Sequence, residues 1–390
     1  MIGWSAVIFV PDDTAKTGYP QPLMLQSTAG APLLAWLANA LFDSGVGRFF
    51  LVCHDRFLDA ARACMPQAAQ VMTAQDSSTA DLMHVFLSTA DDSETEVTVV
   101  AGPAVFVPSL PGAAGAVPSS ICRVSRERLM DALDRQLPFS RFLRENGTCM
   151  TEVDGVYPVE SPADILTLSA LLRRDRALRL MKSGVEIIDE TNCYIDPAVQ
   201  VGAGATLLPG TILRGNTVIG EGSVIGPWST VTNAQLGKNT VVNASVVEDS
   251  VLGDNVSVGP YANLRTGCTV AAGAKLGAFV ELKNVRVGQD AQIPHLSYLG
   301  DAVIGDRANI GCGTVTANFD RVNKHETTVG EDAFVGCNTV LVAPVTVGGG
   351  AYIAAGSAIT EDIPPQALGL ARAHQSVKKD WAAKHKKPQP

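Results

Sequence analysis

Arg265 and Lys283 occupy equivalent positions in a six-residue repeat, at a place where most of the repeats have glycine. The two residues lie 18 residues apart. If three six-residue repeats make one coil, their side chains lie one above the other on the same corner. Two stacked cations suit a phosphate group, because each adds a charge-assisted hydrogen bond. The alternative is that both are solvated charges, as expected for Arg214 at the same repeat position, and spacing alone leaves both interpretations open.

His295 is the candidate acid–base residue. It lies two residues past the inward-facing Ile293, between two repeat steps of five residues where the coil must be distorted. A solitary histidine is more often structural than catalytic, so its neighbours decide its interpretation. The repeat register places Lys283, Tyr298 and Asn318 along one edge, which favours a general base near a phosphate site.

The segment from Asn318 to His325 interrupts the repeat. The spacing from Thr316 to Val329 is thirteen residues, one more than two repeats, and the segment lacks the inward aliphatic pattern. We expect an extended loop that leaves the coil, and loops on rigid repeat scaffolds often carry binding residues. A surface insertion without function is the alternative.

A metal site is disfavoured. His295, His325 and His374 could be proposed as a zinc triad, but they are 30 and 49 residues apart, and such a site needs closely spaced histidines. We therefore expect no metal ion.

These residues lie in a segment with a strict six-residue period. Aliphatic side chains recur every six residues from Ile195 to Val231, resume at Leu252, and continue to Ile359 with two steps of five. No helix has this period, whereas a β-helix of stacked coils does. The residue after each aliphatic is usually small, and we interpret the glycines there as sharp bends.

Residues 1–158 show strands alternating with helices. Strand candidates are Ala6–Val10, Phe49–Cys53 and Glu96–Ala101, and helix candidates are Pro32–Leu41 and Arg126–Leu137, the second closed by Pro138. This alternation predicts an α/β domain with a parallel, Rossmann-like sheet.

A helix should connect the two halves. Ser161 can cap it, Pro162 suits its first turn, and Gly184 should end it near Lys182. We therefore divide the chain into an α/β domain (1–158), a linker helix (159–186), a β-helix domain (187–366) and a C-terminal tail (367–390).

Composition excludes several classes of protein. The net charge is −9, which disfavours nucleic acid as a partner, and no apolar run approaches a membrane span. The opening MIGWSAVIFV lacks a basic n-region, so we interpret it as a strand rather than a signal peptide. None of the eight cysteines forms a C-x-x-C pair, which favours reduced thiols and a cytoplasmic location.

Residues from about 251 to 381 closely resemble the acetyltransferase domain of the bacterial bifunctional N-acetylglucosamine-1-phosphate uridyltransferase/glucosamine-1-phosphate acetyltransferase family. The resemblance rests on YANLRTG, GAFVELKN, HLSYLGDAVIGDRANIGCGTVTANFD, VNKHETTVGEDAFVG, APVTVGGGAYIAAGSAIT and ARAHQSVKKDW. It implies a left-handed parallel β-helix and a homotrimer with sites between subunits. It also implies acetyl-CoA as co-substrate and an amino-sugar phosphate as acceptor.

The resemblance also implies roles for particular residues. His295 matches the general base, and the sugar-phosphate contacts match Arg265, Lys283, Tyr298, Asn309 and Lys324. The acetyl-CoA positions match Cys312, Asn318, Phe319, Cys337, Ala355 and Arg372. Three of these depart from the family, in which Ala is usual at 312, Tyr at 319 and Ser at 337.

The first half resembles the family's nucleotidyltransferase domain in layout but not in chemistry. The stretch after Val10 holds a single glycine, Gly18, and cannot form a phosphate cradle. Where the family has a metal-binding aspartate, this chain reads Ala101-Gly102-Pro103-Ala104 and has no carboxylate for magnesium. We predict that uridyltransferase activity is lost.

The predicted function is therefore N-acetylation of glucosamine-1-phosphate, a step of UDP-N-acetylglucosamine and cell-wall biosynthesis. Two alternatives stay open: an enzyme that retains both activities, and a non-catalytic trimeric scaffold that binds a sugar phosphate or acyl-CoA.

Overall fold

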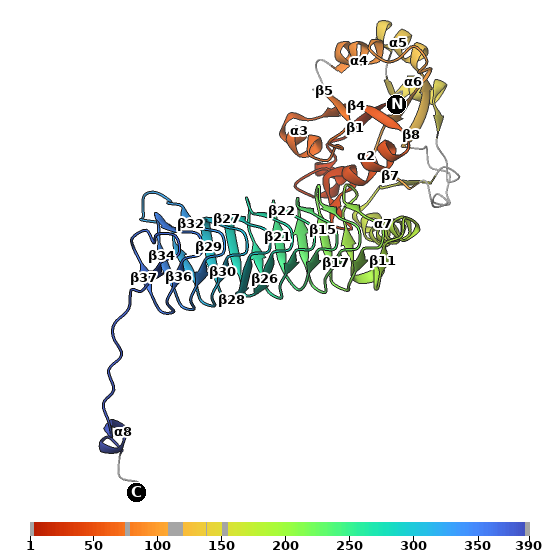
Figure 1. Cartoon of the computed structure of the whole chain (residues 1–390). Helices are drawn as coiled ribbons and strands as arrows, with labels where there is room; N and C mark the ends of the chain where they lie inside the picture. The colour runs from red at the N-terminus through yellow and green to blue at the C-terminus, as the bar shows by residue number, and fades with distance from the viewer. Residues whose placement is uncertain (1–3, 75–78, 108–119, 138, 150–154, 387–390) are drawn as a thin grey trace. The chain divides into compact units, whose positions relative to one another are not determined.

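A computed structural model describes residues 4–74, 79–107, 120–137, 139–149 and 155–386 (Figure 1). The chain divides into two compact units, Met1–Asn239 and Thr240–Pro390. Strands of the hexapeptide type occur in both units. Among the described residues, the helices are all too short or too polar to cross a membrane.

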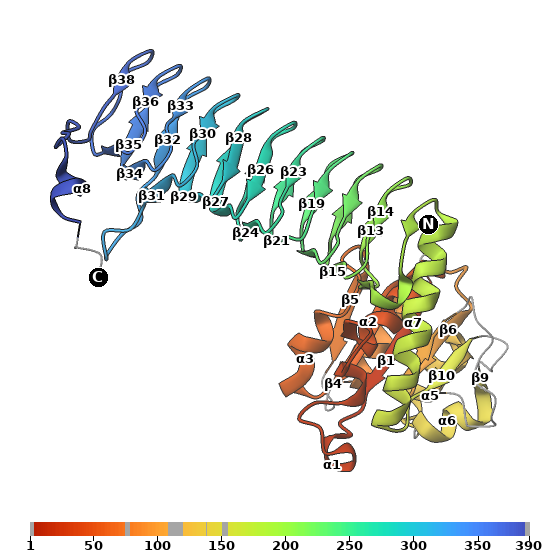
Figure 2. The same cartoon turned by 90° about the horizontal axis from the view of Figure 1, so that it is seen from below.

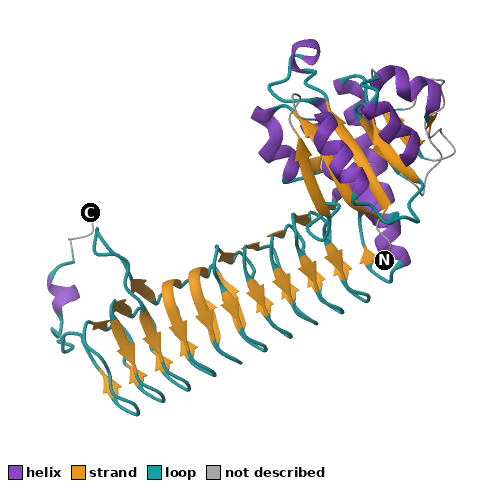
Figure 3. Ribbon diagram, turned by 90° about the horizontal axis from the view of Figure 1, so that it is seen from above, coloured by secondary structure: helices purple, strands orange, loops and turns teal. Residues whose placement is uncertain are grey.

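The first unit contains a six-stranded sheet with helices on both faces (Figure 3). Its order is β5-β4-β1-β6-β8-β9, and the pairs β1–β4, β1–β6 and β4–β5 are parallel, as predicted. Strand β8 pairs antiparallel with β6, and β9 pairs antiparallel with β8, so β8 alone runs against the other five strands. The expectation of a parallel sheet was wrong at β8, since an antiparallel neighbour needs no helical crossover to join the sheet. The elements are β1 (Trp4–Val10), α1 (Thr14–Thr17), β2 (Ser27–Thr28), β3 (Ala31–Pro32), α2 (Leu33–Asp43), β4 (Val46–Cys53), α3 (Asp55–Arg62), β5 (Gln70–Ala74), α4 (Thr79–Ser88), β6 (Glu96–Val100), β7 (Ala104–Phe106), β8 (Ile121–Ser125), α5 (Arg126–Asp134), α6 (Phe139–Asn146), β9 (Thr148–Cys149) and β10 (Val156–Pro158).

Alternate side chains of β1 pack into the two hydrophobic cores of this domain, one on each face of the sheet. Ala6 and Ile8 belong to the cluster that includes α2, while Val7 belongs to the cluster that includes α4 and α5. This division follows from the two-residue period of a strand, because successive side chains point to opposite faces. A strand apolar on both faces is typical of a sheet covered on both sides.

The predicted helices form, with shifted ends. Helix α2 begins at Leu33, with Pro32 as its N-cap rather than in its first turn. Helix α5 ends at Asp134 instead of Leu137, and Pro138 lies outside the described residues.

The connecting helix α7 spans Pro162–Lys182, as predicted. Ser161 and Asp164 form a reciprocal capping box, and the Asp164 carboxylate accepts a hydrogen bond from the Ser161 backbone N–H at 2.8 Å. Two arginines of α7 hold it against the first coils of the β-helix. Arg173 donates to the Thr191 carbonyl at 2.9 Å, and Arg176 donates to that of Val199.

The β-helix is built from short strands, most of them two or three residues long, stacked in parallel coils (Figure 2). The first unit contributes β11 (Glu186–Ile187), β12 (Tyr194–Ile195), β13 (Gln200–Val201), β14 (Thr206–Leu207), β15 (Ile212–Arg214), β16 (Val218–Ile219), β17 (Val224–Ile225), β18 (Thr230–Thr232) and β19 (Gln235–Leu236). The second unit contributes β20 (Val241–Val242), β21 (Val246–Glu248), β22 (Val251–Leu252), β23 (Ser257–Val258), β24 (Asn263–Leu264), β25 (Thr269–Val270), β26 (Lys275–Ala278), β27 (Glu281–Val287), β28 (Gln292–His295), β29 (Tyr298–Ile304), β30 (Asn309–Ile310), β31 (Val315–Ala317), β32 (Thr327–Val329), β33 (Phe334–Val335), β34 (Val340–Val342), β35 (Val345–Val347), β36 (Tyr352–Ile353), β37 (Ala358–Ile359) and β38 (Leu368–Gly369). The exposed C-terminal tail carries α8 (Trp381–Lys384).

Three repeats make one coil. Ile195 pairs with Leu213, and Leu264 pairs with Leu282, each 18 residues on. A five-residue step shortens the next coil, so that Leu282 pairs with Leu299. Nearly all the predicted inward residues are buried; Val201 is the half-buried exception. The fold is therefore an α/β domain joined to a left-handed parallel β-helix.

The glycines that recur after the inward aliphatic residues are required for a reason other than the predicted sharp bends. Most of those that follow the inward aliphatic have ordinary negative φ. A Cβ on Gly277 would lie 1.9 Å from the Pro294 carbonyl oxygen of the next coil, and one on Gly305 would lie 2.4 Å from the Glu331 nitrogen. Close approach between coils, rather than backbone freedom, requires glycine at these positions.

Candidate functional site

The two cations first singled out stack in adjacent coils. Leu264 and Leu282 are register partners, and the Arg265 N–H donates to the Leu282 carbonyl at 2.9 Å, so Arg265 and Lys283 follow at equivalent positions. The next position in the same row is Gly300, the partner of Lys283. The predicted stacking of Arg265 and Lys283 is therefore confirmed in the backbone register.

A third cation comes from the interrupting loop. A hydrogen bond with Lys324, together with the positive charges of Lys324 and Arg265, holds the pKa of Lys283 below its usual value. Carboxylates lie at the edges of this group: Glu281 Oε1 is 3.0 Å from Arg265 Nη1, and Asp301 Oδ2 is 4.0 Å from Lys324 Nζ. Three cations that repel one another make an arrangement that gains stability when an anion binds.

Gly300 shapes the surface beside these cations. A Cβ on Gly300 would lie 2.6 Å from the Tyr298 hydroxyl and 2.7 Å from Asn318 Nδ2, so both polar groups face this glycine. Asn318 is largely buried and donates to Asp301 Oδ2 at 2.6 Å. The predicted shared edge of Lys283, Tyr298 and Asn318 is therefore present, with Gly300 at its centre.

The loop that carries Lys324 is compact and held from within. Phe319 and Lys324 form an antiparallel bridge, and the loop projects beside β32 (Figure 1). Hydrogen bonds from His325 and from the backbone N–H groups of Asn323 and Val322 hold the pKa of Asp320 well below its usual range. The His325 ring nitrogen lies 2.8 Å from the Asp320 carboxylate. Asp320 therefore organises the loop and thereby the position of Lys324.

His295 begins a second row of residues, along the corner that follows the strands β28, β30, β33 and β36. The strands are in register, Gln292 with Asn309, Asn309 with Phe334, and Phe334 with Tyr352. A corner residue lies three positions after each of these four strand residues, Gln292, Asn309, Phe334 and Tyr352. In every coil the residue that follows the corner residue has a positive φ. These corner residues are His295, Cys312, Cys337 and Ala355, which we call the corner row.

The corner row joins the predicted base to three of the predicted acetyl-CoA positions. The Asn338 N–H donates to the Cys312 carbonyl at 2.7 Å, and the Gly356 N–H donates to the Cys337 carbonyl at 2.8 Å. His295 is exposed, and a turn of two residues separates it from Tyr298 on the next face. His295, the predicted base, and the three cations therefore lie on neighbouring faces of one coil region.

The remaining predicted residues are more dispersed. Asn309 lies on β30 between Gln292 and Phe334, half-buried, and precedes the corner of Cys312. Phe319 is 60% exposed in the loop. Arg372 lies in the exposed tail, where its Cδ would be 3.9 Å from a Cβ on Gly356.

Two residues of this site were missed by sequence reasoning. Asp301 accepts hydrogen bonds from both Asn284, at 2.7 Å, and Asn318. Gly300 leaves space between Tyr298 and Asn318. Their signal was present, since Gly300-Asp301 interrupts an otherwise apolar strand, but spacing alone did not show what faced them.

The three histidines of the disfavoured zinc triad lie in separate parts of the structure. His295 is on β28, His325 bonds Asp320 in the loop, and His374 is in the tail. Across the described ranges of the chain, no group of three or more histidine, cysteine or acidic side chains could hold a metal ion.

The α/β domain has its own cavity of about 390 Å³ beside the loop that follows Val10. It is lined by Asp13, Lys16, Pro103 and Glu160, among others. Asp13 is engaged in the fold, because its carboxylate accepts a hydrogen bond from the Leu23 N–H at 3.0 Å. The stretch Ala101-Gly102-Pro103-Ala104, matched to the place of the family's aspartate, holds no carboxylate, and its Ala104 is buried in β7.

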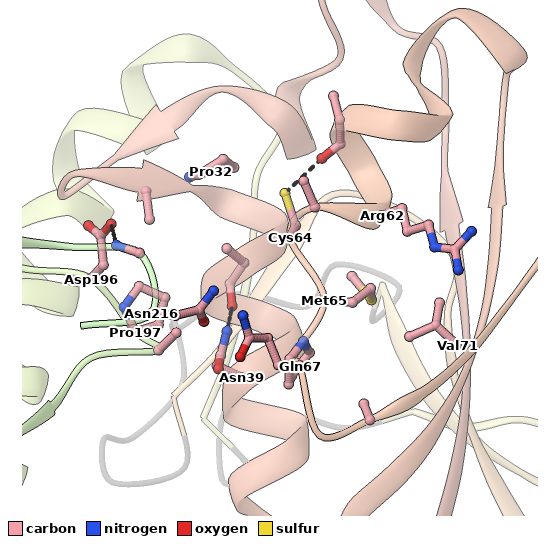
Figure 4. Close-up of a pocket in the computed structure, with 18 residues that line it drawn as sticks. Pro32, Asn39, Arg62, Cys64, Met65, Gln67, Val71, Asp196, Pro197 and Asn216 are labelled. Atoms are coloured by element: carbon pink, nitrogen blue, oxygen red, sulfur yellow. Dashed lines mark hydrogen bonds between the residues drawn. The ribbon is translucent and has the colours of Figure 1, made fainter. Parts of the chain in front are cut away.

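A larger cavity of about 580 Å³ lies in the first unit, between the loop after α3 and the first coils (Figure 4). Asp196 lines it; one carboxylate oxygen accepts from the Gly215 N–H at 2.9 Å, and the other, within the described part of the chain, has no partner. Burial raises the pKa of Asp196 to about 6, and burial also raises the pKa of Cys64, which also lines the cavity, to about 12. Every predicted site residue belongs to the second unit, so this cavity is a separate feature.

Comparison with known proteins supports the resemblance of the repeat region. Residues 198–233 match the model of the bacterial transferase hexapeptide (six repeats). A curated protein of Staphylococcus haemolyticus named Bifunctional protein GlmU is 50% identical over 204 residues, which is 52% of this chain and 45% of that protein. A protein of the same name from Carboxydothermus hydrogenoformans is 45% identical over 226 residues, or 58% of this chain and 51% of that protein. The chain thus spans about half the length of the curated relatives it matches.

Solved structures with similar coils are more distant. The UDP-N-acetylglucosamine acyltransferase of Francisella novicida is 19% identical with a TM-score of 0.28, covering 47% of this chain and 66% of that chain. The enzyme of that name from Campylobacter jejuni is 17% identical with a TM-score of 0.27, covering 52% of this chain and 79% of that chain. Likeness at this level carries no argument about function.

Proposed function

We propose, from the premise that about half of this chain is homologous to curated proteins named Bifunctional protein GlmU, that it transfers an acetyl group from acetyl-CoA to the amine of glucosamine-1-phosphate. Acyl transfer in amino-sugar nucleotide biosynthesis is the coarser assignment, and the hexapeptide match agrees with it. The product is N-acetylglucosamine-1-phosphate.

The observation that carries the proposal is the group of three cations. Arg265, Lys283 and Lys324 come from two coils and the projecting loop, and the lowered pKa of Lys283 reflects their mutual proximity. A phosphate dianion offers oxygen acceptors to all three and relieves their repulsion. We assign Tyr298, whose hydroxyl faces Gly300 beside these cations, to the sugar.

The proposed chemistry needs a free amine. His295 takes a proton from the substrate ammonium as the nitrogen attacks the thioester carbon, and such general-base assistance contributes roughly 10²–10⁴-fold. Asn309 lies on the strand before the corner of Cys312, and we assign it to the sugar. Holding the phosphate at the cations fixes the amine relative to the thioester, which lowers the entropic barrier.

We assign acetyl-CoA to the corner row. Cys312, Cys337 and Ala355 offer three small side chains in successive coils, a surface along which an extended acyl-CoA chain can lie. Asn318, Phe319 and Arg372 complete the proposed coenzyme contacts. Sites between the subunits of a homotrimer are part of this proposal, as is a cytoplasmic enzyme that needs no metal.

We also propose that the α/β domain has lost uridyl transfer. The stretch Ala101-Gly102-Pro103-Ala104 provides no carboxylate for magnesium, and the loop after Val10 holds one glycine. UTP-dependent release of pyrophosphate from N-acetylglucosamine-1-phosphate is the direct assay. Release at the rate of acetyl transfer would instead favour the bifunctional alternative.

The central test is the acetyl-transfer rate of His295→Ala with glucosamine-1-phosphate. We expect a loss of roughly 10²-fold or more in kcat, with unchanged oligomeric state. His84→Ala is the matched control, because His84 lies on α4 of the α/β domain. Near wild-type turnover in His295→Ala would remove the base assignment, and no transfer by the wild-type chain would favour the scaffold alternative.

A further inference from the structure

Two free cysteines occupy neighbouring places in the corner row. Cys312 is half-buried and Cys337 is exposed. Their turns have the same internal structure, since the Thr314 hydroxyl donates to the Gly311 carbonyl at 2.7 Å and the Thr339 hydroxyl to the Gly336 carbonyl at 2.6 Å. Equivalent turns direct equivalent side chains the same way, so both thiols leave the corner on the same side.

The spacing of the coils brings these cysteines within reach of each other. Their strands β30 and β33 are parallel and in register. Parallel neighbours lie about 4.8 Å apart, and disulfides join Cα atoms about 4.4–6.8 Å apart. The N–H after Cys337 donates to the Cys312 carbonyl at 2.7 Å, which fixes this approach.

Five other cysteines are shielded. Cys53, Cys64, Cys122, Cys193 and Cys268 are all buried. Burial raises the pKa of Cys193 to about 11 and also raises that of Cys268, which disfavours the reactive thiolate. Among the seven cysteines whose side chains the structure describes, the accessible thiols are therefore confined to the corner row.

We propose that Cys312 and Cys337 form a modification site, a thiol pair that hydroperoxides oxidise to a disulfide between adjacent coils. His295, the preceding member of the corner row, stands next to Cys312 and can accept its proton, and the thiolate is the nucleophile that reacts. This chain has cysteine at both positions, whereas the family that it resembles usually has alanine and serine.

The reaction balances with peroxide as the oxidant. The Cys312 thiolate attacks the O–O bond, forming a sulfenic acid, and the hydroxide that leaves takes up the thiol proton as water. The Cys337 thiol then attacks the sulfenic sulfur, the S–S bond forms, the S–O bond breaks, and a second water leaves. The two thiols lose two electrons and two protons, and one hydrogen peroxide becomes two waters.

The consequence for acetyl transfer rests on the proposed function. If acetyl-CoA lies along the corner row, a disulfide across two of its members changes the surface that the coenzyme must contact. Oxidation would then inhibit the enzyme, and reduction would restore it. The thiol pair itself is a property of the fold and does not depend on that assignment.

The test of the thiol pair is a peptide map of the full chain after hydrogen peroxide and alkylation, without reductant. Trypsin places Cys312 in residues 308–321 and Cys337 in residues 325–372, so a disulfide appears as two linked peptides that separate on reduction. We expect this link in the wild type and its loss in Cys312→Ala. Thiols that stay reduced, or that oxidise separately without the link, would overturn the proposal.

Cys312→Ala and Cys337→Ala are suitable variants, because Ala278 and Ala355 hold the matching corner positions of neighbouring coils. In each protein, acetyl-CoA turnover is compared before and after peroxide. We expect the wild type to lose about tenfold, or ~1.4 kcal/mol, and to recover with dithiothreitol, while either variant keeps its own untreated rate. Full activity of the cross-linked wild type would overturn the proposed effect of the disulfide on acetyl-CoA binding. If the untreated wild type is inactive, the proposed function is refuted, and the peptide map alone then decides whether the thiol pair forms.

Discussion

Asp196 makes the stability of the first unit depend on pH in a way that can be calculated. It is 9% exposed, and burial raises its pKa from 3.8 to about 6, against the opposing effects of the Gly215 N–H and of Arg214 and Arg176. Because the folded state binds this proton more tightly than the unfolded state, the contribution is most favourable below about pH 4. It declines as the pH rises to about 6, by ~3 kcal/mol in total.

The measurable quantity is the change between two pH values. Linkage with these two pKa values gives a free energy of unfolding about 1.4 kcal/mol higher at pH 5 than at pH 8 from Asp196 alone. Asp196→Asn keeps an oxygen for the Gly215 N–H, 2.9 Å from the present carboxylate, but does not titrate. The variant should therefore lose this part of the pH dependence.

The assay is urea unfolding of the full chain at pH 5 and pH 8, followed by tryptophan fluorescence. Trp36 is 6% exposed in the core of the α/β domain, and its indole N–H donates to the Thr28 carbonyl at 2.8 Å, so its emission reports unfolding of that unit. Asp59→Asn, at an exposed position of α3, is the matched control. An equal pH dependence in wild type and Asp196→Asn would refute the reasoning.

Three further perturbations test the second unit. Leu282→Ala removes a fully buried side chain from the inward column and should lower the free energy of unfolding by about 2–5 kcal/mol, measured by chemical denaturation. Lys283→Gln should raise the KM for glucosamine-1-phosphate by roughly tenfold or more with a smaller change in kcat, whereas Lys275→Gln, at an exposed position of β26, should change neither. Asp320→Ala should loosen the loop that holds Lys324 and raise the same KM, with faster amide hydrogen exchange confined to that loop.

Each of these has a clear contrary result. Wild-type stability in Leu282→Ala would mean that the column is not a packed core. Equal KM values for Lys283→Gln and the wild type would show that the cations do not bind the acceptor. A raised KM in Asp320→Ala without faster exchange would assign the effect to charge instead of loop order.

The β-helix could be predicted from sequence because its signal is local and repeated. The repeat around each residue is enough to identify Leu264, Leu282 and Leu299 as inward-facing. The six-residue period then predicts that these side chains stack into one buried column. The same register predicted that Arg265 and Lys283 stack. In the α/β domain, the strand predicted over Ala6–Val10 was equally clear, because this part of β1 is apolar and packs on both faces.

Tertiary structure decided what the period does not encode. The antiparallel β8, the fold of the loop around Asp320, and the glycine contacts between coils all depend on which segments meet across long separations. The corner row of His295, Cys312, Cys337 and Ala355 became visible only in three dimensions, because a loop insertion of irregular length separates the second and third members in sequence. Sequence determined the residues that could do chemistry, and the stacking of coils determined which of them are neighbours, since side-chain proximity is set by register between coils and not by distance along the chain.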